Sequence, residues 1–272
     1  KDGQIVITFG KGGGALTYNQ SLKNLGKKTK VILGESNTLG YGCTLMGRIK
    51  GKEYANKVRI EGVSHFTTIA AFPGKNTSKV IDAMVSLYPK GTRSYNAGFN
   101  VIETILLDYN AITHVPPMIC NAGRIETGDK TFCLFGKNVY TPSVARVMQG
   151  VDEERMAISK ALGYKTWSYV EDRGRTKDYY STVHTPFLEV CEGPFSLKAR
   201  HITEDVPYGL VTFASLGDML KVPTPVTNTV ITIASTLNNE DYWKLGRTVD
   251  KLGFSPSWNA KQVNKFLIEG KV

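Results

Sequence analysis

The feature that most constrains this chain is a change in the spacing of its apolar residues near residue 95. Before that point, short β-branched segments with alternating apolar residues follow one another, which is the pattern of half-buried strands. After it, apolar residues recur every three or four positions, as on the buried face of a helix. A chain of 272 residues is long enough for two domains. The sequence therefore predicts a strand-rich domain over residues 1–95 and a mostly helical domain over residues 96–272.

The strand-rich domain is predicted to alternate strands with helices. A glycine-rich turn separates its first two strands, and a helix with one apolar face follows its last strand. This order is typical of a parallel α/β layer. The predicted strands cover residues 4–9, 30–34, 45–49, 54–60 and 66–72, and the predicted helix covers 76–88.

The helical domain shows two apolar stripes at helical spacing, over residues 101–112 and 226–237. Thr141-Pro142 and Thr224-Pro225 each predict a helix start, because Thr is a good N-cap and Pro needs no backbone N–H at the first helical position.

The charge balance favours anionic partners. The chain has 34 Lys and Arg residues against 24 Asp and Glu, a formal net charge of +10. No apolar run reaches the ~18–20 residues of a membrane-spanning helix, and the first residues lack the pattern of a secretory signal. These features predict a cytoplasmic globular protein.

Four cysteines lie far apart in the sequence, without a CxxC pair or a histidine at ligand spacing. We predict that they are reduced and packed in the interior, and we predict no metal site. They are Cys43, Cys120, Cys133 and Cys191.

A glycine-rich turn over residues 10–15 follows the first predicted strand and fits GxGxxG/A. Such glycines let backbone N–H groups approach a pyrophosphate. Glu35 ends the next strand at the position of a ribose-binding acid. Gly12, Gly13 and Glu35 are therefore candidate cofactor contacts, although glycine turns after strands are common and a purely structural turn is the alternative.

Two polar clusters stand out in the helical domain. One runs from Asn110 through His114 to two prolines, and because Pro116 disfavours helix at the residue before it, His114 is predicted at a helix end. The other runs from Arg200 through Glu204 and Asp205 to a Pro-Tyr-Gly turn. Each has a structural alternative: a histidine bonded in the core, a solvated surface arginine, or an aspartate that caps a helix.

In their order and spacing these residues resemble the opine dehydrogenase family, the NAD/NADP octopine/nopaline dehydrogenases. The resemblance rests on Arg200 with Glu204-Asp205-Val206-Pro207-Tyr208-Gly209, on Asn110 with His114, and on the segment 121–126. It extends over essentially the whole chain.

The resemblance implies an α/β Rossmann-type domain followed by a mostly α-helical C-terminal domain of the 6-phosphogluconate dehydrogenase-like type. Residues 1–95 would be the C-terminal part of the NAD(P)-binding domain, and residues 96–272 the substrate-binding and catalytic domain. The family's first strand and main glycine fingerprint would precede Lys1, so the Rossmann domain is expected to be incomplete at its N-terminal side. The turn over residues 10–15 would then belong to a later strand.

The resemblance also implies a reaction and roles for residues. The family condenses an amino acid reductively and reversibly with a 2-oxo acid such as pyruvate, using NAD or NADP as cofactor. By position, His114 would be the general acid/base, Asp205 its orienting carboxylate, and Arg200 the group that holds the oxo-acid carboxylate. Asn110 and Glu204 are further candidates for substrate contact. These types suit the roles, because imidazole titrates near neutral pH and a guanidinium bonds a carboxylate with two parallel N–H groups.

Two alternatives stay open on the sequence alone. One is another dehydrogenase with a Rossmann and a helical domain, acting on a hydroxy acid or sugar acid. The other is a basic, non-catalytic nucleic-acid-binding module, which basic clusters could support by neutralising phosphates. The sequence leaves open which amino acid is used, whether NADH or NADPH is bound, and whether the protein forms a homodimer. The basic clusters are Lys23, Lys27, Lys28 and Lys30, and Lys50, Lys52, Lys57 and Arg59.

Overall fold

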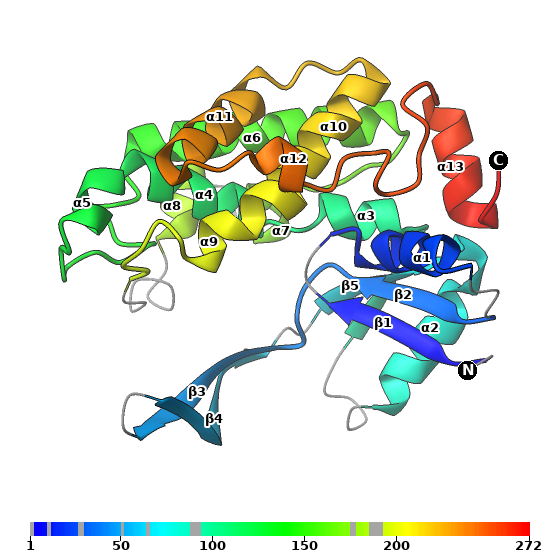
Figure 1. Ribbon diagram of the computed structural model, residues 1–272, viewed down its shortest axis with the longest axis horizontal. Coiled ribbons are helices and arrows are strands. Elements are labelled where there is room, and N and C mark those ends of the chain that lie inside the picture. Colours follow the sequence, from blue (N-terminus) through cyan, green and yellow to red (C-terminus); the bar gives the residue numbers. More distant parts are fainter. Residues whose placement is uncertain are drawn as a thin grey trace. The chain divides into compact units, whose positions relative to one another are not determined.

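The computed structural model of the chain describes residues 3–9, 12–26, 30–49, 52–63, 66–87, 94–174, 178–184 and 193–272. It divides into two compact units (Figure 1). Unit 1 is Lys1–Thr104 with Leu267–Gly270, and unit 2 is Ile105–Phe266 with Lys271–Val272. The division thus falls after Thr104, whereas the change in apolar spacing predicted it near residue 95.

Unit 1 contains a four-stranded sheet in the order β1-β2-β5-β6, of which Figure 1 labels β1, β2 and β5. The pairs β1/β2 and β5/β6 are parallel, whereas β2 and β5 are antiparallel. The predicted parallel layer is therefore confirmed at two pairings and wrong at the third. Parallel neighbours need a long crossover connection, and the chain instead runs from β2 to β5 through a hairpin. The strands are β1 (Ile5–Phe9), β2 (Ile32–Ser36), β5 (Phe66–Phe72) and β6 (Ser94–Ala97), the last of which was not predicted.

The connecting hairpin forms a two-stranded antiparallel sheet of its own. β3 (Tyr41–Ile49) and β4 (Lys52–Val63) pair from Tyr41 opposite Val63 to Ile49 opposite Lys52. The two strands predicted here are confirmed, and both are longer than their apolar alternation indicated.

The helices of unit 1 cover the sheet with the apolar faces that their sequences provide. α1 (Gly14–Asn24) follows the glycine turn, and α2 (Thr77–Ser86) follows a short 3-10 turn, η1 (Gly74–Asn76). Val80 and Met84 of α2 pack on Ile69 and Ala71 of β5, and all four are buried. Removing such apolar surface from water stabilises this layer.

Unit 2 is built from helices, with α4 (Asn110–Cys120) packed against α6, α9 and α11. The helix starts predicted at Thr141-Pro142 and Thr224-Pro225 are confirmed, since Pro142 and Pro225 are the first residues of α6 and α11. α3 (Val101–Leu106) spans the division between the units, and α13 (Ala260–Glu269) begins in unit 2 and ends among the residues of unit 1. The other elements are α5 (Ala122–Glu126), α6 (Pro142–Ala161), α7 (Tyr169–Asp172), α8 (Tyr179–Val183), α9 (Arg200–Thr203), the π-helical turn η2 (Val206–Leu210), α10 (Val211–Leu220), α11 (Pro225–Asn238) and α12 (Tyr242–Leu245).

The stripe over residues 101–112 is not one helix, because the chain turns between α3 and α4. The carboxylate of Asp108 accepts a hydrogen bond from the backbone N–H of Asn110 at 3.1 Å. This bond from the backbone to a side chain two residues earlier replaces a backbone hydrogen bond of a continuous helix. α3 therefore ends before it and α4 begins after it. The apolar spacing continues across this break, which is why the sequence did not reveal it.

The cysteine prediction is only partly confirmed. Cys43 and Cys120 are free thiols but are exposed, and Cys133 is half-buried, so these three are not the interior packing residues that we predicted. Cys191 lies outside the described residues. In the part of the chain that the structure describes, no helix is both long and apolar enough to cross a membrane.

Candidate active site

Two helical segments of unit 2 meet at the candidate site. One is α4, and the other is the run of α9, η2 and α10, in which Asp205 lies just before η2. The segments approach closely at Gly209, because a Cβ there would lie only 2.5 Å from the Cβ of Ala111. Any side chain at Gly209 would therefore push the segments apart. The π-helical geometry of η2 is itself rare and common at functional sites.

His114 and Asp205, which the resemblance pairs as acid/base and orienting carboxylate, are in direct contact. Nδ1 of His114 lies 2.7 Å from Oδ2 of Asp205, although 91 residues separate them in the chain. Asp205 is 2% exposed and His114 13% exposed. A carboxylate on Nδ1 fixes the ring tautomer and leaves Nε2 to exchange protons with a ligand.

The position of His114 within its helix differs from the prediction. α4 continues through Pro116 and Pro117 to Cys120, so His114 lies inside the helix and not at its end. A proline inside a helix costs about 3 kcal/mol. The apolar residues of α4 offset this cost, since Val115, Met118 and the prolines themselves are buried.

Two further rings contact the imidazole, and sequence reasoning missed both. His201 lies with its ring centroid 4.8 Å from that of His114 at an interplanar angle of 67°, and Phe135 lies at 6.0 Å and 59°. The sequence left His201 as a structural residue. The signal available in the sequence was its position directly after Arg200, a predicted site residue. In the structure α9, which carries both residues, packs on α4.

The three predicted substrate contacts surround this centre without bonding to it. Arg200 is exposed and begins α9, next to His201. Asn110 is half-buried and lies one helical turn before His114, so the two share a face of α4. Glu204 is half-buried and precedes Asp205. Among the described residues, no hydrogen bond or ion pair joins the side chains of these three to His114 or Asp205.

The glycine turn in unit 1 holds a carboxylate of the chain itself. The two carboxylate oxygens of Glu35 accept the backbone N–H groups of Gly13 and Ala15, each at 2.9 Å, and the Thr104 hydroxyl at 3.0 Å. Glu35 is 0% exposed, and Gly12 and Gly13 are buried.

The anion-binding end of α1 is thus filled by Glu35, and a pyrophosphate placed there would be repelled by its charge. Glu35 therefore bonds to the backbone of its own turn, and the cofactor contacts considered for Gly12, Gly13 and Glu35 stay predictions. Gly10 and Lys11 of the same turn lie outside the described residues.

A buried ion pair in unit 2 was also missed. Arg155 and Asp152 of α6 are both 0% exposed, and their N and O atoms lie 2.6 Å apart. The guanidinium donates to the carbonyls of Leu106 and Trp167, and the carboxylate accepts from the Tyr179 hydroxyl at 2.9 Å. Burial, together with this carboxylate, raises the pKa of Tyr179, so the phenol stays a neutral donor. The pair fixes Trp167 and Tyr179 to the core.

Comparison with known proteins agrees with the geometry. The profile of the NAD/NADP octopine/nopaline dehydrogenase, alpha-helical domain, matches residues 98–238, which include His114, Arg200 and Asp205. An opine dehydrogenase of Arthrobacter sp. (strain 1C) is 31% identical over 261 residues, covering 93% of this chain and 69% of that relative.

Solved structures show the same fold. An octopine dehydrogenase structure with NADH and L-arginine has a TM-score of 0.69 at 17% identity. The match covers 100% of this chain and 73% of the chain in that structure. A PanE/ApbA family ketopantoate reductase from Ralstonia eutropha JMP134 has a TM-score of 0.52 at 14% identity. That match covers 88% of this chain and 68% of the chain of the reductase.

These matches confirm the predicted combination of a Rossmann-type and a helical domain, and they favour neither of the two alternatives. On the profile match and the Arthrobacter relative, the chain belongs to the NAD/NADP octopine/nopaline dehydrogenases, the opine dehydrogenase family of NAD(P)-dependent oxidoreductases.

Proposed function

We propose that this enzyme joins an amino acid to a 2-oxo acid such as pyruvate and reduces the adduct with NAD(P)H, reversibly, to an N-(carboxyalkyl) amino acid. The observation that carries the proposal is the 2.7 Å contact between His114 Nδ1 and Asp205 Oδ2. Octopine dehydrogenase structures with NADH and either L-arginine or pyruvate support this pair of substrate classes.

His114 is the proposed general acid/base. When the amine nitrogen adds to the carbonyl carbon, the C–N bond forms and the carbonyl electron pair moves to oxygen, which takes a proton. Loss of water then breaks the C–O bond, needs a second proton on the departing hydroxyl, and releases one from nitrogen. An imidazole can donate and recover these protons through Nε2. Asp205 holds Nδ1 and stabilises the charged ring between transfers.

Arg200 is the proposed partner of the oxo-acid carboxylate. Its guanidinium is exposed at the start of α9, and the next residue, His201, contacts the ring of His114. A bidentate bond from this position would fix the carbonyl carbon relative to the imidazole. Glu204 and Asn110 are proposed to contact the amino acid, because each lies within one turn of a member of the His114–Asp205 pair.

We assign none of the described residues to the cofactor. The reduced cofactor is the family's hydride donor, and we place no pyrophosphate contact on the N–H groups of Gly13 and Ala15, because Glu35 already accepts hydrogen bonds from them.

The deciding experiment measures NAD(P)H oxidation by the full-length protein with pyruvate, with and without a panel of amino acids. We expect turnover only when an amino acid is present, because the proposed reaction consumes the amine. Turnover that does not depend on the amine would instead indicate a hydroxy-acid dehydrogenase and overturn the proposal.

We also infer a reducing compartment, the cytoplasm, for this enzyme. The free thiols of Cys43 and Cys120 support that inference. A homodimer is likewise a proposal, and light scattering of the purified full-length protein would test it.

A further inference from the structure

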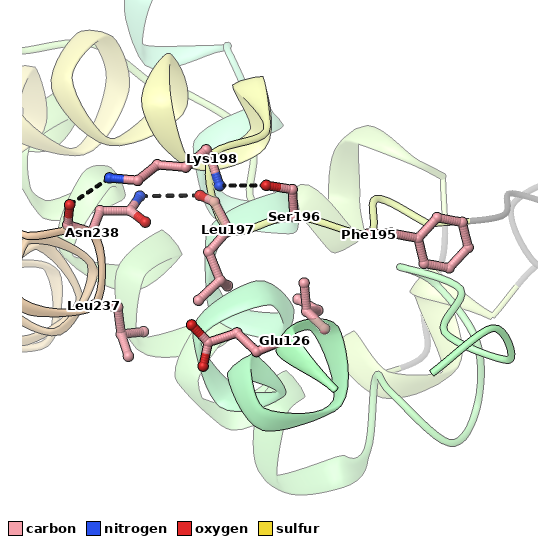
Figure 2. A pocket seen from close by; sticks show the side chains of 8 residues that line it. Glu126, Phe195, Ser196, Leu197, Lys198, Leu237 and Asn238 are labelled. Atoms are coloured by element: carbon pink, nitrogen blue, oxygen red, sulfur yellow. Dashed lines mark hydrogen bonds between the residues drawn. The ribbon is translucent and has the colours of Figure 1, made fainter. Parts of the chain in front are cut away.

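A pocket separate from the His114–Asp205 pair lies in unit 2, between the ends of α5 and α11 and the segment that leads into α9 (Figure 2). Its volume is about 360 Å³, enough for a small organic ligand. Apolar walls come from Ile125, Leu197 and Leu237. Neither His114 nor Asp205 lines it, and neither do the three proposed substrate contacts.

The pocket contains a buried acceptor without a donor. Asn238 is 3% exposed, and its Nδ2 donates to the Leu197 carbonyl at 3.0 Å and to the Tyr242 hydroxyl oxygen at 2.7 Å. These two bonds fix the amide orientation. Its Oδ1 is buried and has no hydrogen-bond partner among the described residues. An unpaired buried acceptor costs free energy. A ligand that donates a hydrogen bond to it removes this cost and is therefore bound more tightly.

A carboxylate faces the same space. Figure 2 shows the Glu126 side chain directed toward Leu197 and Leu237, below the amide of Asn238. No ion pair involves Glu126 in the described part of the chain. Lys198 is the cation nearby, and its ammonium donates to the Asn238 backbone carbonyl at 2.5 Å. The pocket is therefore lined by Glu126, which is exposed, and by Asn238, whose Oδ1 is buried. The Lys198 ammonium beside them is bonded to a backbone carbonyl.

We propose that this pocket binds a primary amine in its protonated form, with a short branched apolar chain. The ammonium group donates to Asn238 Oδ1 and to the Glu126 carboxylate. The apolar chain packs on Ile125, Leu197 and Leu237. This proposal does not depend on the proposed reaction, because the pocket and the His114–Asp205 centre use different residues.

The test titrates the full-length protein with 3-methylbutylammonium and follows the side-chain amide resonances of Asn238 by NMR. Two analogues separate the contributions: the N-trimethyl derivative keeps the charge but has no N–H, and 3-methylbutanol has no charge. We expect saturable shifts of the Asn238 amide with the primary amine, and binding at least tenfold weaker for both analogues.

Variants locate the site. Glu126→Gln should weaken binding of the amine roughly ten- to hundredfold by removing a charged acceptor. Leu237→Trp should fill the pocket and abolish saturation. Asp218→Asn, a change at an exposed carboxylate on α10, is the matched control and should leave the affinity unchanged. The proposal is overturned if the Asn238 resonances do not shift saturably, if the trimethyl analogue binds equally well, or if Glu126→Gln keeps the wild-type affinity.

Discussion

The imidazole of His114 is held by three side chains from two different segments. Asp205 bonds its Nδ1, while the rings of His201 and Phe135 limit where it can turn. A side chain fixed in one rotamer loses less entropy when it reaches the arrangement in which a proton moves. We therefore expect the exchange of protons at Nε2 to depend on all three neighbours.

Replacing His114 by Ala should lower turnover by roughly 10²–10⁴, the usual contribution of a general acid/base. The loss should appear in kcat, because no substrate-binding group is removed. Steady-state kinetics of the full-length protein measure it, and added imidazole should restore part of the rate. Wild-type kcat in a folded His114→Ala protein would refute the assignment.

Arg200→Lys should mainly raise the KM for the 2-oxo acid, because lysine keeps the charge but loses the planar two-bond contact. The KM for the amino acid should change much less. Kinetics with each substrate varied in turn separate the two effects. Equal KM values in variant and wild type would mean that the oxo acid binds elsewhere.

At this scale, the residues of the His114–Asp205 pair could be predicted, but their contact could not. Spacing along the chain carries no information on a bond across 91 residues, which depends on how α9 and η2 pack on α4. His201 was missed for the same reason. The bonds of Glu35 to its own turn were not foreseen, because a carboxylate after a strand looks the same in the sequence whether it faces a ribose or the backbone of that turn.

At the scale of elements, the stability of the start of α1 depends on hydrogen bonds to Glu35. The two backbone N–H groups that begin this helix have no helical partner and are bonded by one carboxylate. Glu35→Gln turns one acceptor into a donor that faces these N–H groups. We expect a loss of about 1–3 kcal/mol in the free energy of unfolding.

Urea denaturation measures this change. Asp82→Asn, at an exposed site on α2, is the matched control and should shift stability by less than about 0.5 kcal/mol. A Glu35→Gln protein as stable as this control would show that the carboxylate does not hold the turn.

The elements themselves could largely be predicted where one pattern acts alone, as in β5, whose bounds match the prediction. The prediction was wrong where tertiary packing overrides a local rule. Pro116 and Pro117 stay inside α4 because that helix is buried on most of its surface. β6 was missed because its four residues are mostly exposed and polar.

For the whole molecule, the net charge of +10 should act on the approach of substrates. Dinucleotide cofactors and 2-oxo acids are anions, and long-range attraction raises their rate of encounter. We expect kcat/KM for the oxo acid to fall as ionic strength rises past ~0.1 M, where the screening length is about 10 Å. An unchanged kcat/KM across that range would show that the excess charge lies too far from the site to matter.

The close approach at Gly209 limits which positions of such an enzyme can be substituted during evolution. The distance between the proton-handling side chains is set by a helix contact in the interior, in which a single methyl group has no room. Arg200, by contrast, is exposed at the first turn of a short helix. With the proposed roles of Arg200 and His114, we expect substitutions around that surface to alter which substrates are accepted without disturbing the His114–Asp205 contact. New specificities would then arise through single surface changes, while the interior keeps the chemistry.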